Sequence, residues 1–124
     1  MAPTGPAPTP LPISATELCR RLQDSSDAAT AIQQVDVRED SELDLARLNR
    51  PVLHLPLGRS QDWVERIDVL LDRTRPVAVL CHAGVRSWHF GCWLIQEHAF
   101  AEVWNVQGGI DAWSVEVDGS VPRY

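Results

Sequence analysis

One cysteine in this chain lies where a thiol would be chemically active. The apolar run 76–80 leads directly into Cys81, and a helix-like apolar pattern begins near Trp88. The run is typical of a buried strand, so Cys81 is expected in the turn between that strand and the start of a helix. Backbone N–H groups and the positive end of the helix dipole converge at such a position, and both favour the thiolate over the thiol. Cys81 is therefore the candidate catalytic nucleophile.

The residues that follow Cys81 are suited to holding an anion. Main-chain N–H groups of the loop can surround a charged sulfur, and Gly84 permits a positive φ or a close backbone approach. Arg86 can brace the loop or offer a cation to an anionic substrate, and Ser87 is suited to the start of the helix. The expected active loop comprises His82, Ala83, Gly84, Val85, Arg86 and Ser87.

Three signatures in this chain resemble those of the rhodanese (sulfurtransferase) family. Cys81 and Arg86 bracket four residues, as in the six-residue active loop of that family. Residues 35–39 resemble its strand that ends in Asp-Val-Arg, and residues 103–113 resemble its double-glycine turn into a tryptophan-bearing helix. The resemblance covers about residues 14–124 and implies a single domain. It also implies that Asp36 and Arg38 support the site from the neighbouring strand end, where ligands of α/β sheets gather.

Short apolar strands alternate with helical patterns along the chain. Strands are expected at 33–37, 52–55, 76–80 and 102–106, and helices from Ser14, over 41–48, from Ser60, over 87–98 and near Ile110. The alternation predicts an α/β fold with a central, mostly parallel sheet that is covered by helices on both faces. The resemblance implies that this is one rhodanese-like domain over 13–124, with a sheet of about five strands. Residues 1–12 contain five of the nine prolines, so they are expected to form a disordered leader.

Composition and charge exclude several classes of function. The chain has a net charge of −6 and no lysine, and an acidic chain without a basic cluster is a poor partner for nucleic acids or membranes. No stretch has the length of a membrane span or the pattern of a signal peptide, so the default location is cytoplasmic. The three cysteines (Cys19, Cys81 and Cys92) form neither a disulfide framework nor a metal pattern. No metal and no other cofactor is expected.

The resemblance implies a ping-pong sulfurtransferase. The Cys81 thiolate would take a sulfane sulfur from a donor such as thiosulfate, hold it as a persulfide and pass it to cyanide or a thiol. The uncharged loop residues leave the donor open among thiosulfate, 3-mercaptopyruvate and glutathione persulfide. One alternative is a persulfide relay or binding module that serves a partner protein. Another is a Cys–Arg phosphatase or arsenate reductase, whose loop has five residues between cysteine and arginine because a phosphoryl group needs a wider cradle.

Overall fold

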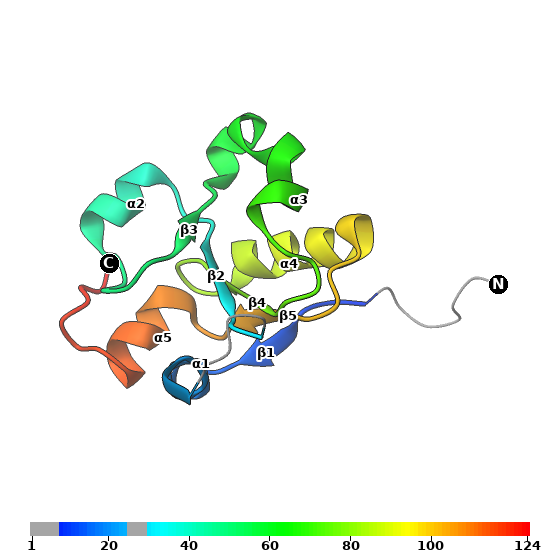
Figure 1. The fold of residues 1–124 in the computed structure, drawn as a ribbon. Coiled ribbons are helices and arrows are strands. Elements are labelled where there is room, and N and C mark those ends of the chain that lie inside the picture. Colours follow the sequence, from blue (N-terminus) through cyan, green and yellow to red (C-terminus); the bar gives the residue numbers. More distant parts are fainter. Residues whose placement is uncertain (1–7, 25–29) are drawn as a thin grey trace.

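The computed structural model of the chain describes residues 8–24 and 30–124, which form one parallel β-sheet flanked by helices (Figure 1). The sheet has five strands in the order β1-β5-β4-β2-β3, and all of its pairings are parallel. The strands are β1 (Leu11–Ile13), β2 (Gln33–Asp36), β3 (Leu53–His54), β4 (Val77–Leu80) and β5 (Val103–Val106). The predicted α/β class with a parallel sheet of about five strands is confirmed.

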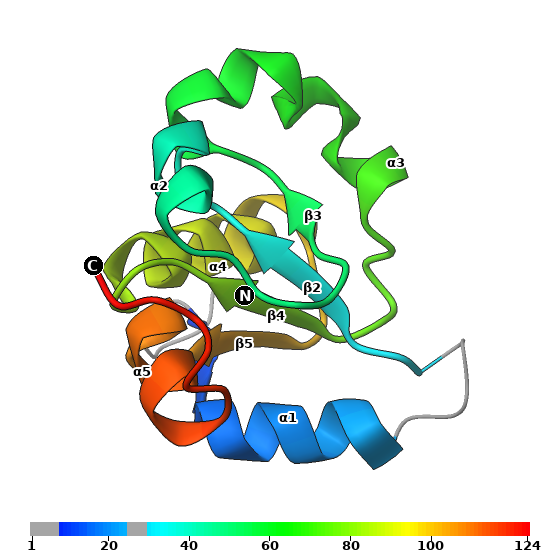
Figure 2. The same cartoon turned by 90° about the vertical axis from the view of Figure 1, so that its left-hand side faces the viewer.

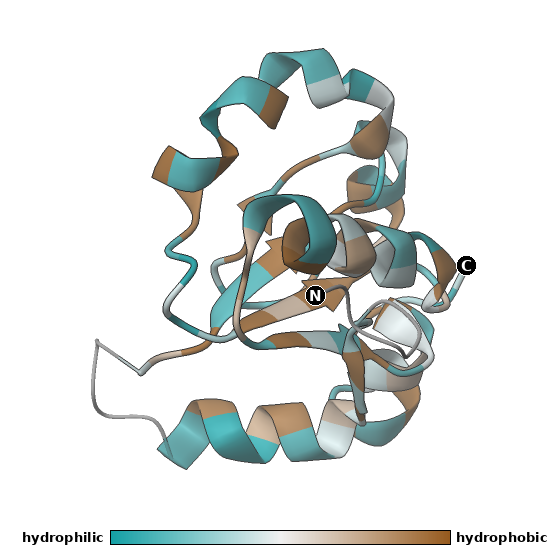
Figure 3. Ribbon diagram, turned by 90° about the vertical axis from the view of Figure 1, so that its right-hand side faces the viewer, coloured by the Kyte–Doolittle hydropathy of each residue, from teal (hydrophilic) through white to brown (hydrophobic). Residues whose placement is uncertain are grey.

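Helices cover both faces of this sheet, as predicted (Figure 2). On one face lie α1 (Ala15–Asp24) and α5 (Gly109–Glu116), and on the other lie α3 (Ile67–Leu70) and α4 (Val85–His98). The short helix α2 (Asp40–Leu45) follows β2. In Figure 3, α1 turns its hydrophobic residues toward the sheet and its hydrophilic residues away. Within residues 8–24 and 30–124, no helix is long and apolar enough to cross a membrane.

The alternation of side chains along β4 decides which face receives the candidate nucleophile. Val77, Val79 and Cys81 belong to the buried cluster on the α3 and α4 face, whereas Ala78 and Leu80 belong to the cluster on the α1 and α5 face. This is the two-residue period of a strand that is covered on both sides. Cys81 therefore extends the α4-facing row at the carboxyl end of a central strand.

The sheet begins inside the segment predicted to be a disordered leader. Residues 1–7 of that segment lie outside the described residues, but Leu11 and Pro12 already pair with β5 as part of β1. Ile13 is 3% exposed, so β1 contributes to the core. The proline-rich composition did not indicate a strand, because proline is disfavoured in central strands. β1, however, lies at the edge of the sheet, where proline is tolerated. β1 therefore begins two residues before the boundary expected at residue 13.

The helix predicted from Ser60 is broken into three short pieces. The chain forms two 3₁₀ segments, η1 (Leu57–Asp62) and η2 (Val64–Arg66), before the single turn of α3. Trp63 lies between them with φ −137°, which is outside the helical range. Its indole N–H donates to the carbonyl of Pro56 at 3.0 Å, and its ring contacts Phe90 and Trp93. The contacts of this ring in the core are formed at the expense of a continuous helix. The apolar period nevertheless predicted the buried residues Trp63 and Ile67 correctly.

The edge strand gives a first prediction. Ile13→Ala removes a buried side chain of β1 and should lower the free energy of unfolding by about 2–5 kcal/mol. Leu11→Ala, on the same strand but 54% exposed, should change it by less than about 0.5 kcal/mol. Urea unfolding followed by tryptophan fluorescence measures both variants. Equal, small effects would mean that β1 is not part of the cooperative fold.

Candidate active site

The sulfur of Cys81 lies at the N-terminus of α4 and accepts a main-chain hydrogen bond. Cys81 directly follows β4 and is 1% exposed. The N–H of Gly84 donates to its Sγ at 3.0 Å, and the hydroxyl of Ser87 lies 3.2 Å from the same atom. Gly84 has a φ of +111° and caps α4, which begins at Val85, two residues earlier than predicted. The positive φ of Gly84 is what turns the chain from the loop into the helix while its N–H faces the sulfur.

Asn105 on β5 fastens the active loop at two points. Its side-chain N–H donates to the carbonyl of Gly84 at 2.9 Å, and its side-chain oxygen accepts from the hydroxyl of Ser87 at 2.5 Å. A hydroxyl has one proton, so Ser87 donates to Asn105 or to the sulfur of Cys81, but not to both at once. Asn105 therefore competes with the sulfur of Cys81 for the proton of the Ser87 hydroxyl.

The start of α5 determines which way the loop faces. The N–H groups of Ile110 and Asp111 donate to the carbonyls of Cys81 and His82 at 2.9 and 3.3 Å. Because a trans peptide is planar, the N–H that follows each of these carbonyls points away from α5. Gly109 makes this approach feasible: its φ is +57°, and a Cβ there would lie 2.3 Å from the carbonyl oxygen of Cys81. The double-glycine turn identified in the sequence thus lies directly against the active loop.

Arg86 braces the loop against α2 through a two-pronged ion pair. Its terminal nitrogens donate to the two carboxylate oxygens of Glu42 at 2.7 and 2.8 Å. The hydrogen bonds from Arg86, together with one from the backbone N–H of Glu39, lower the pKa of Glu42 to about 2. Glu42 is therefore ionised at neutral pH, and the charge of Arg86 is matched by a carboxylate of the protein.

The ring of Tyr124 connects both ends of the loop. It stacks on the imidazole of His82, with ring centroids 4.1 Å apart and an angle of 10° between the planes. Its hydroxyl donates to Glu42 at 3.1 Å and accepts from Arg38 at 2.9 Å. His82, at the start of the loop, and Arg86, at its end, are thus held through one aromatic side chain and its carboxylate partner.

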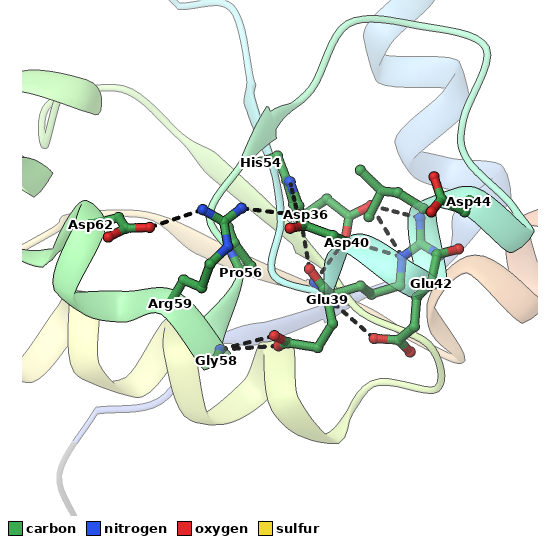
Figure 4. A network of polar contacts seen from close by, with 12 residues as sticks. Asp36, Glu39, Asp40, Glu42, Asp44, His54, Pro56, Gly58, Arg59 and Asp62 are labelled. Carbon is green, nitrogen blue, oxygen red and sulfur yellow. Dashed lines mark hydrogen bonds and ion pairs between the residues drawn. The ribbon is translucent and has the colours of Figure 1, made fainter.

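Asp36 and Arg38 form a buried pair behind the loop. Their side chains are 2% and 0% exposed, and Nη2 of Arg38 donates to Asp36 at 2.9 Å. The carbonyl of Arg38 lies 2.6 Å from Nε2 of His54, which acts as the donor because a carbonyl can only accept. Figure 4 shows Asp36 and His54 of this region, with Glu42 nearby. Arg38 also donates to the carbonyl of Glu42 and to the hydroxyl of Tyr124. The role of the pair in supporting the site stays a prediction.

The other cysteines lie apart from the loop. Cys19 is on α1, across the sheet from the face that Cys81 joins, and Cys92 is in the middle of α4. Both are free, and burial raises the pKa of the Cys92 thiol. Trp88 is 40% exposed in the first turn of α4. In the described part of the chain, no group of three or more His, Cys, Asp or Glu side chains could hold a metal ion.

Sequence reasoning located the loop but missed three residues that hold it: Glu42, Asn105 and Tyr124. Asn105 had a usable signal, because it is a polar residue inside the apolar strand 103–106. Glu42 is one of several acidic residues in 39–44, and nothing in the sequence separates it from its neighbours. Tyr124 follows a turn-like segment, so its return to the loop depends on tertiary packing alone.

Comparisons with known proteins agree on one family. A family model described as rhodanese-like domain matches residues 14–116. The rhodanese-like/PpiC domain-containing protein 12, chloroplastic, of Arabidopsis thaliana is 37% identical over 113 residues, which cover 90% of this chain and 36% of that protein. The thiosulfate sulfurtransferase GlpE of Coxiella burnetii is 30% identical over 78 residues, covering 63% of this chain and 67% of that protein.

Solved structures show the same fold. A crystal structure of Saccharomyces cerevisiae Ygr203w, described as a homolog of single-domain rhodanese and of the Cdc25 phosphatase catalytic domain, superposes with a TM-score of 0.69. The two chains are 21% identical, and the match covers 90% of this chain and 85% of that one. The chain spans only between 21% and 36% of the length of the first curated relatives that it matches.

The contact between α5 and the loop gives a second prediction. Gly109→Ala places a Cβ against the carbonyl of Cys81 and strains a positive φ, so it should cost more than about 2 kcal/mol of stability and lower any Cys81-dependent activity. Gly119→Ala is the matched control, because a Cβ there meets no atom within 4 Å. Thermal unfolding compares the two. A Gly109→Ala variant as stable and active as the control would contradict the proposed packing.

The Arg86–Glu42 pair gives a third prediction, on pH. The pKa of Glu42 falls from 4.5 to about 2 on folding, so the pair contributes stability above the unfolded value and loses it as the pH falls through 4.5 toward 2. The difference in unfolding free energy between the wild type and Glu42→Gln should therefore be full at neutral pH and shrink over that window. Urea unfolding at a series of pH values measures it. A difference independent of pH would show that the ion pair does not stabilise the fold.

Proposed function

The chain belongs to the rhodanese-like domain family, and we propose that it is a sulfurtransferase that carries a sulfane sulfur as a persulfide on Cys81. The observation that carries the proposal is the hydrogen bond from the N–H of Gly84 to the buried Sγ of Cys81 at 3.0 Å. A thiolate in a dry site needs fixed donors, and a main-chain N–H at the start of a helix is such a donor. Ser87 supplies a second one when its hydroxyl turns from Asn105 to the sulfur.

In the first half-reaction the Cys81 thiolate attacks the outer sulfur of the donor. With thiosulfate, a bond forms between Sγ and that sulfur, the bond between the two sulfurs of thiosulfate breaks, and sulfite leaves with the electron pair. In the second half-reaction a thiol or cyanide attacks the outer sulfur of the persulfide, and the Cys81 thiolate is the leaving group. Charge and atoms balance in both steps without a metal or a cofactor.

Loop donors stabilise the persulfide better than the free thiol. The N–H groups in the first turn of α4, which begins at Val85, have no carbonyl partner within the helix. The positive end of the helix dipole also favours negative charge there. A second sulfur would extend about 2 Å beyond the sulfur of Cys81, a residue that is 1% exposed.

The burial of Cys81 also bears on the partners. A small donor such as thiosulfate and a slender acceptor such as cyanide or a thiol suit a sulfur that is 1% exposed. A protein that accepts the sulfur is compatible with the same chemistry if its thiol lies on an extended or protruding segment. We place the reaction in the cytoplasm, where Cys19 and Cys92 stay reduced and thiols that recharge or discharge Cys81 are abundant.

Phosphatase chemistry is the second candidate, because the yeast structural relative is described as a homolog of both rhodanese and a phosphatase domain. Four residues separate Cys81 from Arg86 in this chain, and both terminal nitrogens of Arg86 are engaged by Glu42. A phosphoryl group needs a wider loop and an arginine that is free to bind its oxygens. Turnover of p-nitrophenyl phosphate that is lost in Cys81→Ser would favour this second candidate.

A fourth prediction tests the proposed function. Cys81→Ser should abolish the transfer of sulfur from thiosulfate to cyanide, because an alcohol cannot form a stable persulfide analogue. Cys92→Ser removes a half-buried thiol from α4 and should retain the activity. Mass spectrometry of the wild type after exposure to donor should locate one added sulfur atom on the peptide that contains Cys81. Retained transfer in Cys81→Ser would refute the mechanism.

A further inference from the structure

The positive charge nearest the end of the active loop is already neutralised by the protein. Both terminal nitrogens of Arg86 donate to Glu42, and the side chain of Glu42 is only 18% exposed. The carboxylate is itself held in place by the backbone N–H of Glu39 at 2.9 Å and by the hydroxyl of Tyr124 at 3.1 Å. With its partner fixed from three directions, Arg86 is not free to turn toward a substrate anion.

The other arginines beside the loop are paired in the same way. Arg38 is fully buried against Asp36, and Arg123 donates to both carboxylate oxygens of Asp111, the residue whose N–H bonds the loop carbonyl of His82. Each of these cations thus has a carboxylate of its own. The charged side chains around the loop sum to no net positive charge that could attract a doubly charged anion.

Three apolar side chains of the loop and of the first turn of α4 are exposed, beside the exposed His89. Ala83 is exposed, Val85 is 68% exposed and Trp88 is 40% exposed. Such a surface favours an organic substituent over a second charged group, because burying a charge against apolar side chains without a partner is costly. This apolar surface does not depend on the Arg86–Glu42 ion pair, and it bears on the part of a donor that remains outside the loop.

We infer that Glu42 is a specificity-determining residue which, by occupying Arg86, makes the site favour donors with one negative charge and an organic group over the dianion thiosulfate. The substrate class is that of organic persulfides (R–S–S⁻) and thiosulfonates (R–SO₂–S⁻). The inference rests on the proposed sulfurtransferase function and deepens it. With the methanethiosulfonate ion as donor, the Cys81 thiolate takes the terminal sulfur, the S–S bond breaks, and methanesulfinate leaves with the electron pair. One negative charge stays on the persulfide and one on the leaving group, so the step balances.

The test compares two donors of similar size that differ by one charge. Thiosulfate and the methanethiosulfonate ion both present a terminal sulfur on a tetrahedral sulfur, but a methyl group replaces one charged oxygen in the second. The readout is the ratio of kcat/KM for thiosulfate to kcat/KM for methanethiosulfonate, with the same acceptor. A variant that is merely less stable loses activity with both donors, so this ratio does not change for structural reasons alone.

Glu42→Gln should raise this ratio about tenfold, because it frees the charge of Arg86 for the second charge of thiosulfate. Asp44→Asn is the matched control: Asp44 is on the same helix, is 82% exposed and makes only a 4.0 Å contact with Arg47, so the same change in charge should leave the ratio unaltered. The double variant Glu42→Gln/Arg86→Gln should lose the increase, since no freed cation remains. Glu42→Asp keeps the charge but shortens the side chain that holds Arg86, and should give a smaller increase.

Three results would overturn the inference. These are an unchanged ratio in Glu42→Gln, an equal increase in Asp44→Asn, and an increase that persists without Arg86. If Glu42→Gln does not fold, an unchanged ratio in Glu42→Asp overturns it instead. Failure of the proposed function is a separate result, because the wild type would then transfer sulfur from neither donor.

Discussion

The hydrogen bonds from the start of α5 to the carbonyls of Cys81 and His82 are the contact on which the candidate site depends. They fix the orientation of the first two peptides after β4, and the planarity of those peptides then fixes the direction of the N–H groups that follow. A side chain at Gly109 would prevent the contact, so the glycine turn and the active loop form one structural unit although 28 positions separate Cys81 from Gly109 (109 − 81). Beyond these two peptides, Gly84 adopts a positive φ, its N–H bonds the sulfur, and α4 begins at Val85.

The second organising feature is that charged groups support the loop while uncharged groups contact the sulfur. Sγ is within hydrogen-bonding distance of the N–H of Gly84 and the hydroxyl of Ser87, and neither residue carries a charge. The charged residues form closed pairs behind and beside the loop, with Arg86 bound to Glu42 and Arg38 bound to Asp36. Main-chain dipoles that are already oriented stabilise an anion without reorganising, and they do not attract multiply charged ligands from a distance as free arginines would.

Local sequence patterns predicted most of the fold, because they are set by local physics. Four apolar runs became β2, β3, β4 and β5 within a residue or two, and the cysteine-to-serine segment comprises the turn after β4 and the first residues of α4, which begins at Val85. The patterns failed where tertiary contacts overrode them. Pro12 suggested disorder but lies in an edge strand, and Trp63 interrupted a helix because its ring is anchored in the core. Glu42 and Tyr124 could not be identified, since their partners are 44 and 42 positions away, at Arg86 and His82 respectively, and only folding brings them together (86 − 42; 124 − 82).

The central claim is that main-chain donors of this loop hold a transferable sulfur on Cys81. The most direct measurement is a crystal structure of the protein after reaction with a sulfane donor. We expect one additional sulfur bonded to Sγ of Cys81, lying within hydrogen-bonding distance of the N–H groups at the start of α4. An unmodified Cys81, or an added sulfur on Cys19 or Cys92 instead, would contradict the account.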